Sequence, residues 1–146
     1  MIERPLGPAE HNLILATWIK EFRTSPYAGC LPNHLSTAII RSCIDDLIKA
    51  GATLRGVFEG DTCLGWVCED LATDPQGVEQ AVIHFIYTRS GVSPDTKRAV
   101  REALVPSAGG IYTYRTKTIA DYLGPAWRHR PGIARSRSLK VTHEDS

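Results

Sequence analysis

The sequence predicts an α/β (α+β) domain in which a mixed, mostly antiparallel sheet carries helices on both faces. Three observations predict this class: two amphipathic helical patterns come first, two short strands joined by a tight turn follow, and an apolar strand then leads directly into a helix. The chain has 146 residues, of which 42% are hydrophobic and 23% charged, as is typical of one globular domain. We therefore expect residues 1–146 to form a single domain.

Two helices are expected at the start of the chain. The first runs from about Pro8 to Arg23, because its apolar residues recur at the spacing of one helical face: Leu15, Trp18, Ile19 and Phe22. The same spacing predicts a second helix whose inward face is formed by Ile40, Cys43, Ile44 and Leu47. Ser36 is its expected N-cap, and Gly51 is its expected stop.

An antiparallel strand pair is expected next. Thr53–Glu59 and Thr62–Asp70 have strand character, and Gly60-Asp61 between them suits a two-residue hairpin turn. Alternation along the second strand predicts one face formed by Leu64, Trp66 and Cys68, and an opposite face formed by Cys63, Gly65, Val67 and Glu69. Ala72–Gly77 is predicted to be a loop.

The junction of a strand and a helix is the most informative part of the sequence. Ala81–Thr88 is apolar on both faces except for His84, which predicts a central strand covered by helices. Ser93 as N-cap and Pro94 as first residue then begin a helix, whose buried side carries Val100, Ala103 and Leu104. The expected order ends with a strand at Ile111–Tyr114, a helix over Ile119, Tyr122 and Leu123, and a last strand after Trp127.

Composition and motifs exclude several classes of protein. The longest apolar runs, Leu13–Ala16 and Ala81–Ile83, fall far short of the roughly 18 residues that a membrane span needs. The N-terminus lacks the pattern of a signal peptide, so we expect a cytoplasmic protein. The four cysteines, Cys30, Cys43, Cys63 and Cys68, form no Cys-x-x-Cys pair for a metal, and we expect them reduced and mostly buried. No hydrolase or Walker motif is present.

Four segments, in the right order, resemble the Gcn5-related N-acetyltransferase (GNAT) family, and in particular its small members encoded by bacteriophages. These segments are Ala16–Tyr27, Leu64–Glu69, Val82–Arg89 and Tyr112–Thr116. The second matches a Gly-aromatic-Val-x-Glu strand, and the third matches a His-Tyr-Val-Tyr-Val-Lys strand. The resemblance covers about residues 10 to 131. It implies the GNAT fold, acetyl-CoA as cofactor and an amine as acceptor, in the host cytoplasm if the gene is viral.

The segment that should hold the cofactor departs from the family pattern. GNAT proteins bind the pyrophosphate with an Arg/Gln-x-x-Gly-x-Gly/Ala loop, whose amides point from a helix N-terminus. Here only Gly91 is kept, Pro94 removes an amide donor, and Asp95 adds a negative charge where an anion should bind. The side chains left to contact the phosphates are Arg89, Thr96, Lys97 and Arg98.

Other site residues follow from the resemblance. The backbone of Phe85, Ile86 and Tyr87 would orient the pantetheine arm. His84 or Glu69 would accept the proton of the amine, although a buried core histidine and a solvent-facing carboxylate are the alternatives. Tyr122 would protonate the leaving thiolate, and a packing role fits it equally well.

Two functions remain open at this stage. One is an acetyl-CoA-dependent N-acetyltransferase acting on an amine of a protein or small molecule. The other is a non-catalytic GNAT scaffold that binds and modulates a protein, such as a host enzyme. A homodimer stays open, and a nucleic acid is disfavoured because the basic segment from Trp127 to Lys140 has no aromatic residues after Trp127. The tail from about residue 132 is expected to be solvated.

Overall fold

The computed structural model describes residues 1–23, 32–113 and 123–129. Its elements in chain order are β1 (Ile2–Pro5), the short 3-10 helix η1 (Pro8–Glu10), α1 (His11–Arg23), α2 (Asn33–Lys49), β2 (Thr53–Glu59), β3 (Thr62–Thr73), β4 (Glu79–Thr88), α3 (Pro94–Leu104), β5 (Gly110–Tyr112) and β6 (Trp127–His129). None of the described helices is long and apolar enough to cross a bilayer.

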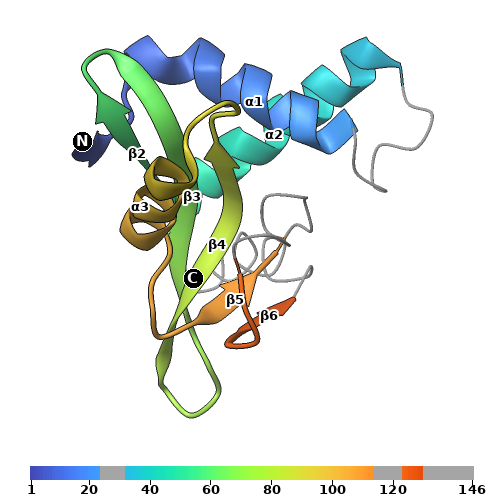
Figure 1. Cartoon of the computed structure of the whole chain (residues 1–146). Coiled ribbons are helices and arrows are strands. Elements are labelled where there is room, and N and C mark those ends of the chain that lie inside the picture. The colour runs from blue at the N-terminus through green and yellow to red at the C-terminus, as the bar shows by residue number, and fades with distance from the viewer. Residues whose placement is uncertain (24–31, 114–122, 130–146) are drawn as a thin grey trace.

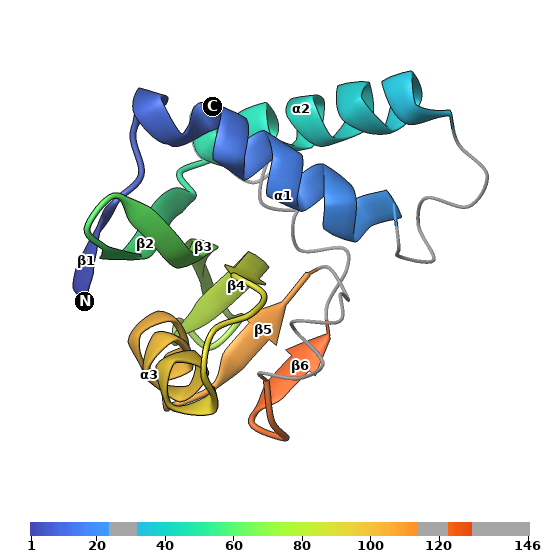
Figure 2. The same cartoon turned by 45° about the horizontal axis from the view of Figure 1, so that its top comes forward.

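The strands among the described residues form one six-stranded sheet in the order β1-β2-β3-β4-β5-β6. Neighbours from β1 to β4 are antiparallel, whereas β4–β5 and β5–β6 are parallel. The parallel step follows from the connection, because α3 carries the chain back along the sheet before β5 begins. Helices α1 and α2 cover one face of the sheet and α3 covers the other (Figures 1 and 2). The expected fold class is confirmed.

An aromatic cluster holds α1 against the sheet. Phe85 stacks on Trp18 with ring centroids 4.7 Å apart, and Trp66 lies 4.8 Å from Phe85. All three side chains are buried, and the Trp66 indole N–H donates to Thr17 Oγ1 over 2.9 Å. Burial of each aromatic ring contributes a few kcal/mol, so this cluster carries much of the α1/α2 core.

The core on the α3 face depends on a glycine. Val100 and Leu104 of α3 pack onto β2, β3 and β4, and both are completely buried. A Cβ atom at Gly65 would lie 2.7 Å from Val100 Cγ1 and 2.7 Å from the Tyr87 carbonyl oxygen. Only glycine therefore allows α3 to approach the sheet this closely.

A β-bulge overturns part of the predicted alternation along β3. Val57 pairs with Gly65 and Phe58 pairs with Cys63, so Leu64 is the extra residue. The expectation that Leu64 lies on the face of Trp66 and Cys68 is wrong: it packs in the α3-side core, and Cys63 takes the α1/α2 side instead.

Several element boundaries also differ from expectation. Helix α2 begins at Asn33, so Ser36 is not an N-cap but a buried residue inside the helix. Strand β3 continues to Thr73, which shortens the predicted 72–77 loop. Strand β1 was not predicted, because its short polar sequence gains its structure from pairing with β2. The expected helix around Tyr122 and the basic tail lie outside the described residues.

Three of the four cysteines lie in the described residues, and Cys30 lies outside them. Cys63 and Cys68 are buried as expected, and Cys43 is half-buried. Burial raises the pKa of the Cys63 thiol, and raises that of the Cys68 thiol far more. These two thiols therefore stay protonated and act as small apolar side chains.

Arg55 fastens the C-terminus of α3 to the sheet. Its guanidinium binds both carboxylate oxygens of Glu69, at 2.8 and 3.1 Å, and also pairs with Glu3. It further donates to the carbonyl of Ala103 at 2.8 Å and to that of Leu104 at 3.4 Å. A cation is favoured there, because the last carbonyls of a helix have no partner within it. The hydrogen bond that Arg55 donates to the Glu69 carboxylate raises the pKa of Arg55.

We predict that Arg55→Ala destabilises the protein by about 1–3 kcal/mol, because it removes a helix cap and leaves Glu69 without its cation. Arg55→Lys should recover only part of this, because an ammonium cannot make the two-pronged contact. Urea unfolding would measure both. Arg41→Ala on the exposed side of α2 serves as control and should change stability by no more than about 0.5 kcal/mol. Equal losses for Arg55→Ala and the control would contradict the structural role of Arg55.

We predict that Gly65→Ala costs about 1–3 kcal/mol, because the new methyl group forces α3 away from the sheet. Gly7→Ala is the matched control, since its Cβ would meet only Glu10 Oε2 at 3.8 Å. Thermal unfolding of the two variants separates the outcomes. A Gly65→Ala protein as stable as the Gly7→Ala protein would show that α3 does not pack this closely.

Candidate functional site

The sheet opens into a fork between β4 and β5. The two strands pair only from Ala81 to Ile83, against Gly110–Tyr112, and the Thr113 amide donates to the Ile83 carbonyl over 3.1 Å. Beyond Ile83, no strand in the described part of the chain pairs with the β5 side of β4. Figure 1 shows β4 continuing toward α1 and α2 while β5 ends lower in the sheet. Among the residues that the structure describes, the backbone of Phe85–Tyr87 therefore lies on an open strand edge.

A second β-bulge sits where the fork begins. Cys68 of β3 pairs with Phe85, but the next residue, Glu69, pairs with Ile83. His84 is therefore the extra residue of β4. Bulges re-aim side chains and are common beside active sites. The one polar residue of this strand thus lies at the point where the two strands separate.

His84 is completely buried between two polar side chains. Its Nδ1 lies 2.8 Å from the Thr113 hydroxyl oxygen. Its Nε2 lies 3.8 Å from a carboxylate oxygen of Asp70, whose side chain is only 6% exposed. That distance is too long for a hydrogen bond, and Nε2 has no hydrogen-bond partner among the described residues. A buried nitrogen in this state is costly, which is unusual in a purely structural position.

Asp70 and Thr113 were not predicted from the sequence. Asp70 appeared to be the last residue of an ordinary strand, and Thr113 lay within the Tyr112–Thr116 segment without an assigned role. They are separated by 43 positions along the chain, and only the sheet brings them both to His84. No periodicity in the sequence could reveal that contact.

The three residues expected to orient a cofactor offer mainly backbone. Phe85 and Ile86 have completely buried side chains, one in each core. Tyr87 is half-buried, and burial raises the pKa of its phenol, so the phenol stays protonated at neutral pH. A ligand at this strand edge would therefore contact mainly the backbone amides and carbonyls of these residues.

Glu69 is placed differently from His84. Both of its carboxylate oxygens are bound by Arg55, as described above. The pair is only partly exposed, with 24% and 26% of the two side chains accessible. The role of Glu69 as a base stays a prediction, and this contact would have to open before the carboxylate could reach an amine.

The N-terminus of α3 has few amides left for a phosphate. Pro94 has no N–H, the Thr96 amide donates to the Ser93 hydroxyl over 3.2 Å, and the Lys97 amide donates to the Ser93 carbonyl over 2.9 Å. The Ser93 hydroxyl in turn donates to the Thr96 hydroxyl over 2.9 Å. Asp95 adds a carboxylate to this turn. Ser93 is thus the N-cap that the sequence predicted.

Two of the predicted phosphate-binding cations line different hollows. Arg89 lines a surface hollow beside α1, together with Arg4 and Glu10. Arg98 lines a pocket on the flank of α3, and Lys97 is exposed at the start of that helix. Tyr122 lies outside the described residues. Within the described ranges, no group of three metal-ligating side chains comes together.

Comparison with solved structures supports the fold. The chain is similar to the crystal structure of a protein described as a probable acetyltransferase, with a TM-score of 0.52 and 11% sequence identity. The match covers 100% of this chain and 89% of that one. An integron cassette protein from the mobile metagenome of Cole Harbour Salt Marsh matches over 69% of this chain and 65% of its own, at 13% identity and a TM-score of 0.46, from which we draw no conclusion.

No family model matches the sequence, and no curated protein matches it. At 11% identity the likeness to the first structure concerns the fold alone. The six-stranded, mostly antiparallel sheet with helices on both faces is consistent with a GNAT-like fold.

Proposed function

We propose that this protein is an acetyl-CoA-dependent N-acetyltransferase that acts on an amine of a protein or small molecule. The observation that carries the proposal is the fork, where an open β4 edge lies directly beside a buried histidine at a bulge. A strand edge can pair with the amide groups of an extended ligand as a further strand would. The GNAT-like fold supports this assignment.

The residues have distinct parts in the proposed reaction. The backbone of Phe85–Tyr87 would hold the pantetheine arm of acetyl-CoA, which supplies the acetyl group as a thioester. A neutral amine attacks the thioester carbonyl, so that a C–N bond forms, the C–S bond breaks and one proton must leave the nitrogen. His84 accepts that proton in our proposal, with Glu69 as the alternative base. Tyr122 would return a proton to the thiolate.

Asp70 and Thr113 support His84 in this scheme as positioning residues. The Thr113 hydroxyl fixes one ring nitrogen, which leaves Nε2 to act. The Asp70 carboxylate at 3.8 Å stabilises the imidazolium once the proton has been taken up. Because Nε2 is completely buried, the amine or a bridging water would have to enter the fork to reach it.

Ligand contact at the fork can be tested by NMR. In a titration with acetyl-CoA, we expect the amide signals of Phe85, Ile86 and Tyr87 to shift, because their strand edge is open. The amides of Ala81 and Val82, which lie where β4 pairs with β5, are the internal control and should move little. Absence of any shift at millimolar acetyl-CoA would end the proposal.

The role of His84 can be tested by substitution. We expect His84→Gln to lower the rate of thiol release from acetyl-CoA, measured with a panel of amines, by about 100-fold or more. The loss should fall on kcat and leave the KM for acetyl-CoA nearly unchanged, whereas a packing defect at the fork would change both. Thr113→Val should retain a larger share of the rate. An unchanged rate with a lowered melting temperature would identify His84 as a core residue only.

A non-catalytic binding protein is the second candidate. It is favoured by the first turn of α3, where Ser93 and Pro94 leave little amide capacity and Asp95 repels an anion. A pull-down from a bacterial lysate should then recover a stoichiometric protein partner. Acetylation that disappears in a Tyr122→Phe variant would count against this function.

A further inference from the structure

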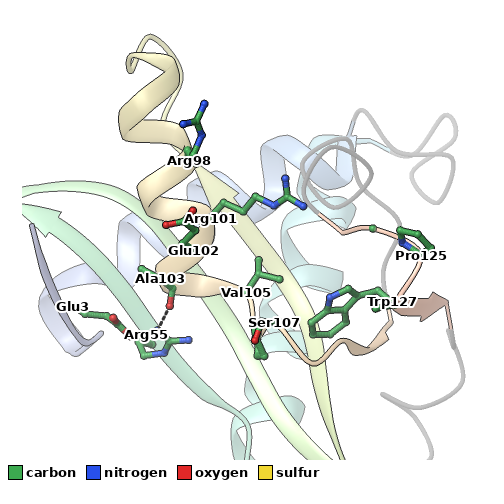
Figure 3. Close-up of a pocket in the computed structure, with 13 residues that line it drawn as sticks. Glu3, Arg55, Arg98, Arg101, Glu102, Ala103, Val105, Ser107, Pro125 and Trp127 are labelled. Carbon is green, nitrogen blue, oxygen red and sulfur yellow. Dashed lines mark hydrogen bonds and ion pairs between the residues drawn. The ribbon is translucent and has the colours of Figure 1, made fainter.

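A second hollow lies away from the fork, on the flank of α3. Its volume is about 850 Å³, within the range of pockets that hold small organic ligands. The pocket lies between the C-terminal half of α3 and the Gly124–Trp127 segment that leads into β6 (Figure 3). No role was assigned to it from the sequence.

Two arginines of α3 face this pocket. Arg98 and Arg101 are three positions apart, which places them on the same side of the helix. In Figure 3 the side chain of Arg101 extends from α3 toward the segment of Pro125 and Trp127. Both arginines are exposed, and neither forms an ion pair with any residue that the structure describes.

The acids near the pocket are held mainly away from these two arginines. Arg55 pairs with both Glu3 and Glu69. Glu102 is the remaining acid of the lining; it is exposed on α3, and no ion pair joins it to Arg98 or Arg101 among the described residues. The three glutamates balance the three arginines in sum, so what the pocket offers a phosphate is two guanidinium groups without an ion pair, not a net positive charge.

Part of the pocket lining is an apolar side. It is formed by Val105, Pro106, Pro125 and Trp127, and only 8% of Trp127 is exposed. A pocket that offers both cations and apolar groups favours an amphipathic anion over a small inorganic one. Its volume also exceeds what a single phosphate would fill.

We propose that this pocket binds a phosphorylated nucleoside, whose phosphate lies against Arg98 and Arg101 and whose ring system lies against the apolar side. Such a group has two sources: the adenosine bisphosphate end of acetyl-CoA, or a free nucleotide. The first source rests on the proposed function and would explain how a cofactor is held although the amides of the α3 N-terminus are occupied.

Calorimetric titration can test the proposal with adenosine 3′,5′-bisphosphate, acetyl-CoA and S-acetylpantetheine. The test variant is Arg98→Ala/Arg101→Ala. The control is Arg41→Ala/Lys49→Ala, which removes the same charge from exposed positions of α2 on the other face of the sheet. We expect the test variant to weaken bisphosphate binding at least tenfold, and the control variant to bind as the wild type does. Binding should also weaken with added salt.

The outcomes separate the two sources and the two proposals. If the test variant also binds acetyl-CoA more weakly, while its affinity for S-acetylpantetheine is unchanged, the pocket belongs to the cofactor. If its affinity falls for the bisphosphate alone, the pocket belongs to a free nucleotide.

The same titrations separate the pocket proposal from the proposed function. If acetyl-CoA binds but the test variant binds every ligand as the control does, the pocket proposal is overturned and the proposed function stands. If the bisphosphate binds through the arginines and acetyl-CoA does not bind, the proposed function fails and the pocket proposal stands. A wild-type protein that does not bind the bisphosphate overturns the pocket proposal.

Discussion

Burial of β4 on both faces is the constraint on which the rest of the structure depends. Phe85 contributes to the core under α1 and α2, and Ile86 contributes to the core under α3. The two helical layers are therefore fixed to the same few residues of one strand. Because both faces must stay apolar, the strand can contribute to a binding site mainly through its backbone. The open edge of β4 is the part of the strand that remains available.

The β-bulge at His84 allows β4 to keep both faces apolar and still place a histidine at the candidate site. An extra residue in β4 shifts the alternation, so that Ile83 and Ile86 both enter the α3-side core although they are three positions apart. The imidazole of His84 is then buried beside Thr113, where β4 and β5 separate. A strand with regular alternation would place these apolar side chains on opposite faces and expose part of the core.

Much of the fold could be predicted from the sequence, because its signals are local. Helix α1 shows a helical repeat, the β2–β3 hairpin has a glycine-first turn, and α3 begins with Ser93-Pro94. The bulges could not be predicted, because they depend on which residues face each other across strands. Two further contacts could not be predicted for the same reason. One is the contact of His84 with Asp70 and Thr113, and the other is the ion pair of Arg55 with Glu69. The pocket beside α3 combines residues that lie far apart in the chain, so no sequence motif could predict it.

The order of pairing in the sheet has a consequence for how the chain assembles during synthesis. Strands β2, β3 and β4 follow one another along the chain as antiparallel neighbours, so their contacts close short loops. The parallel strands β5 and β6 join only after α3 has crossed over and the last part of the chain has emerged. The fork and the arginine pocket therefore form late, and Trp127 of β6 completes the α3-side core in the same step that completes the pocket.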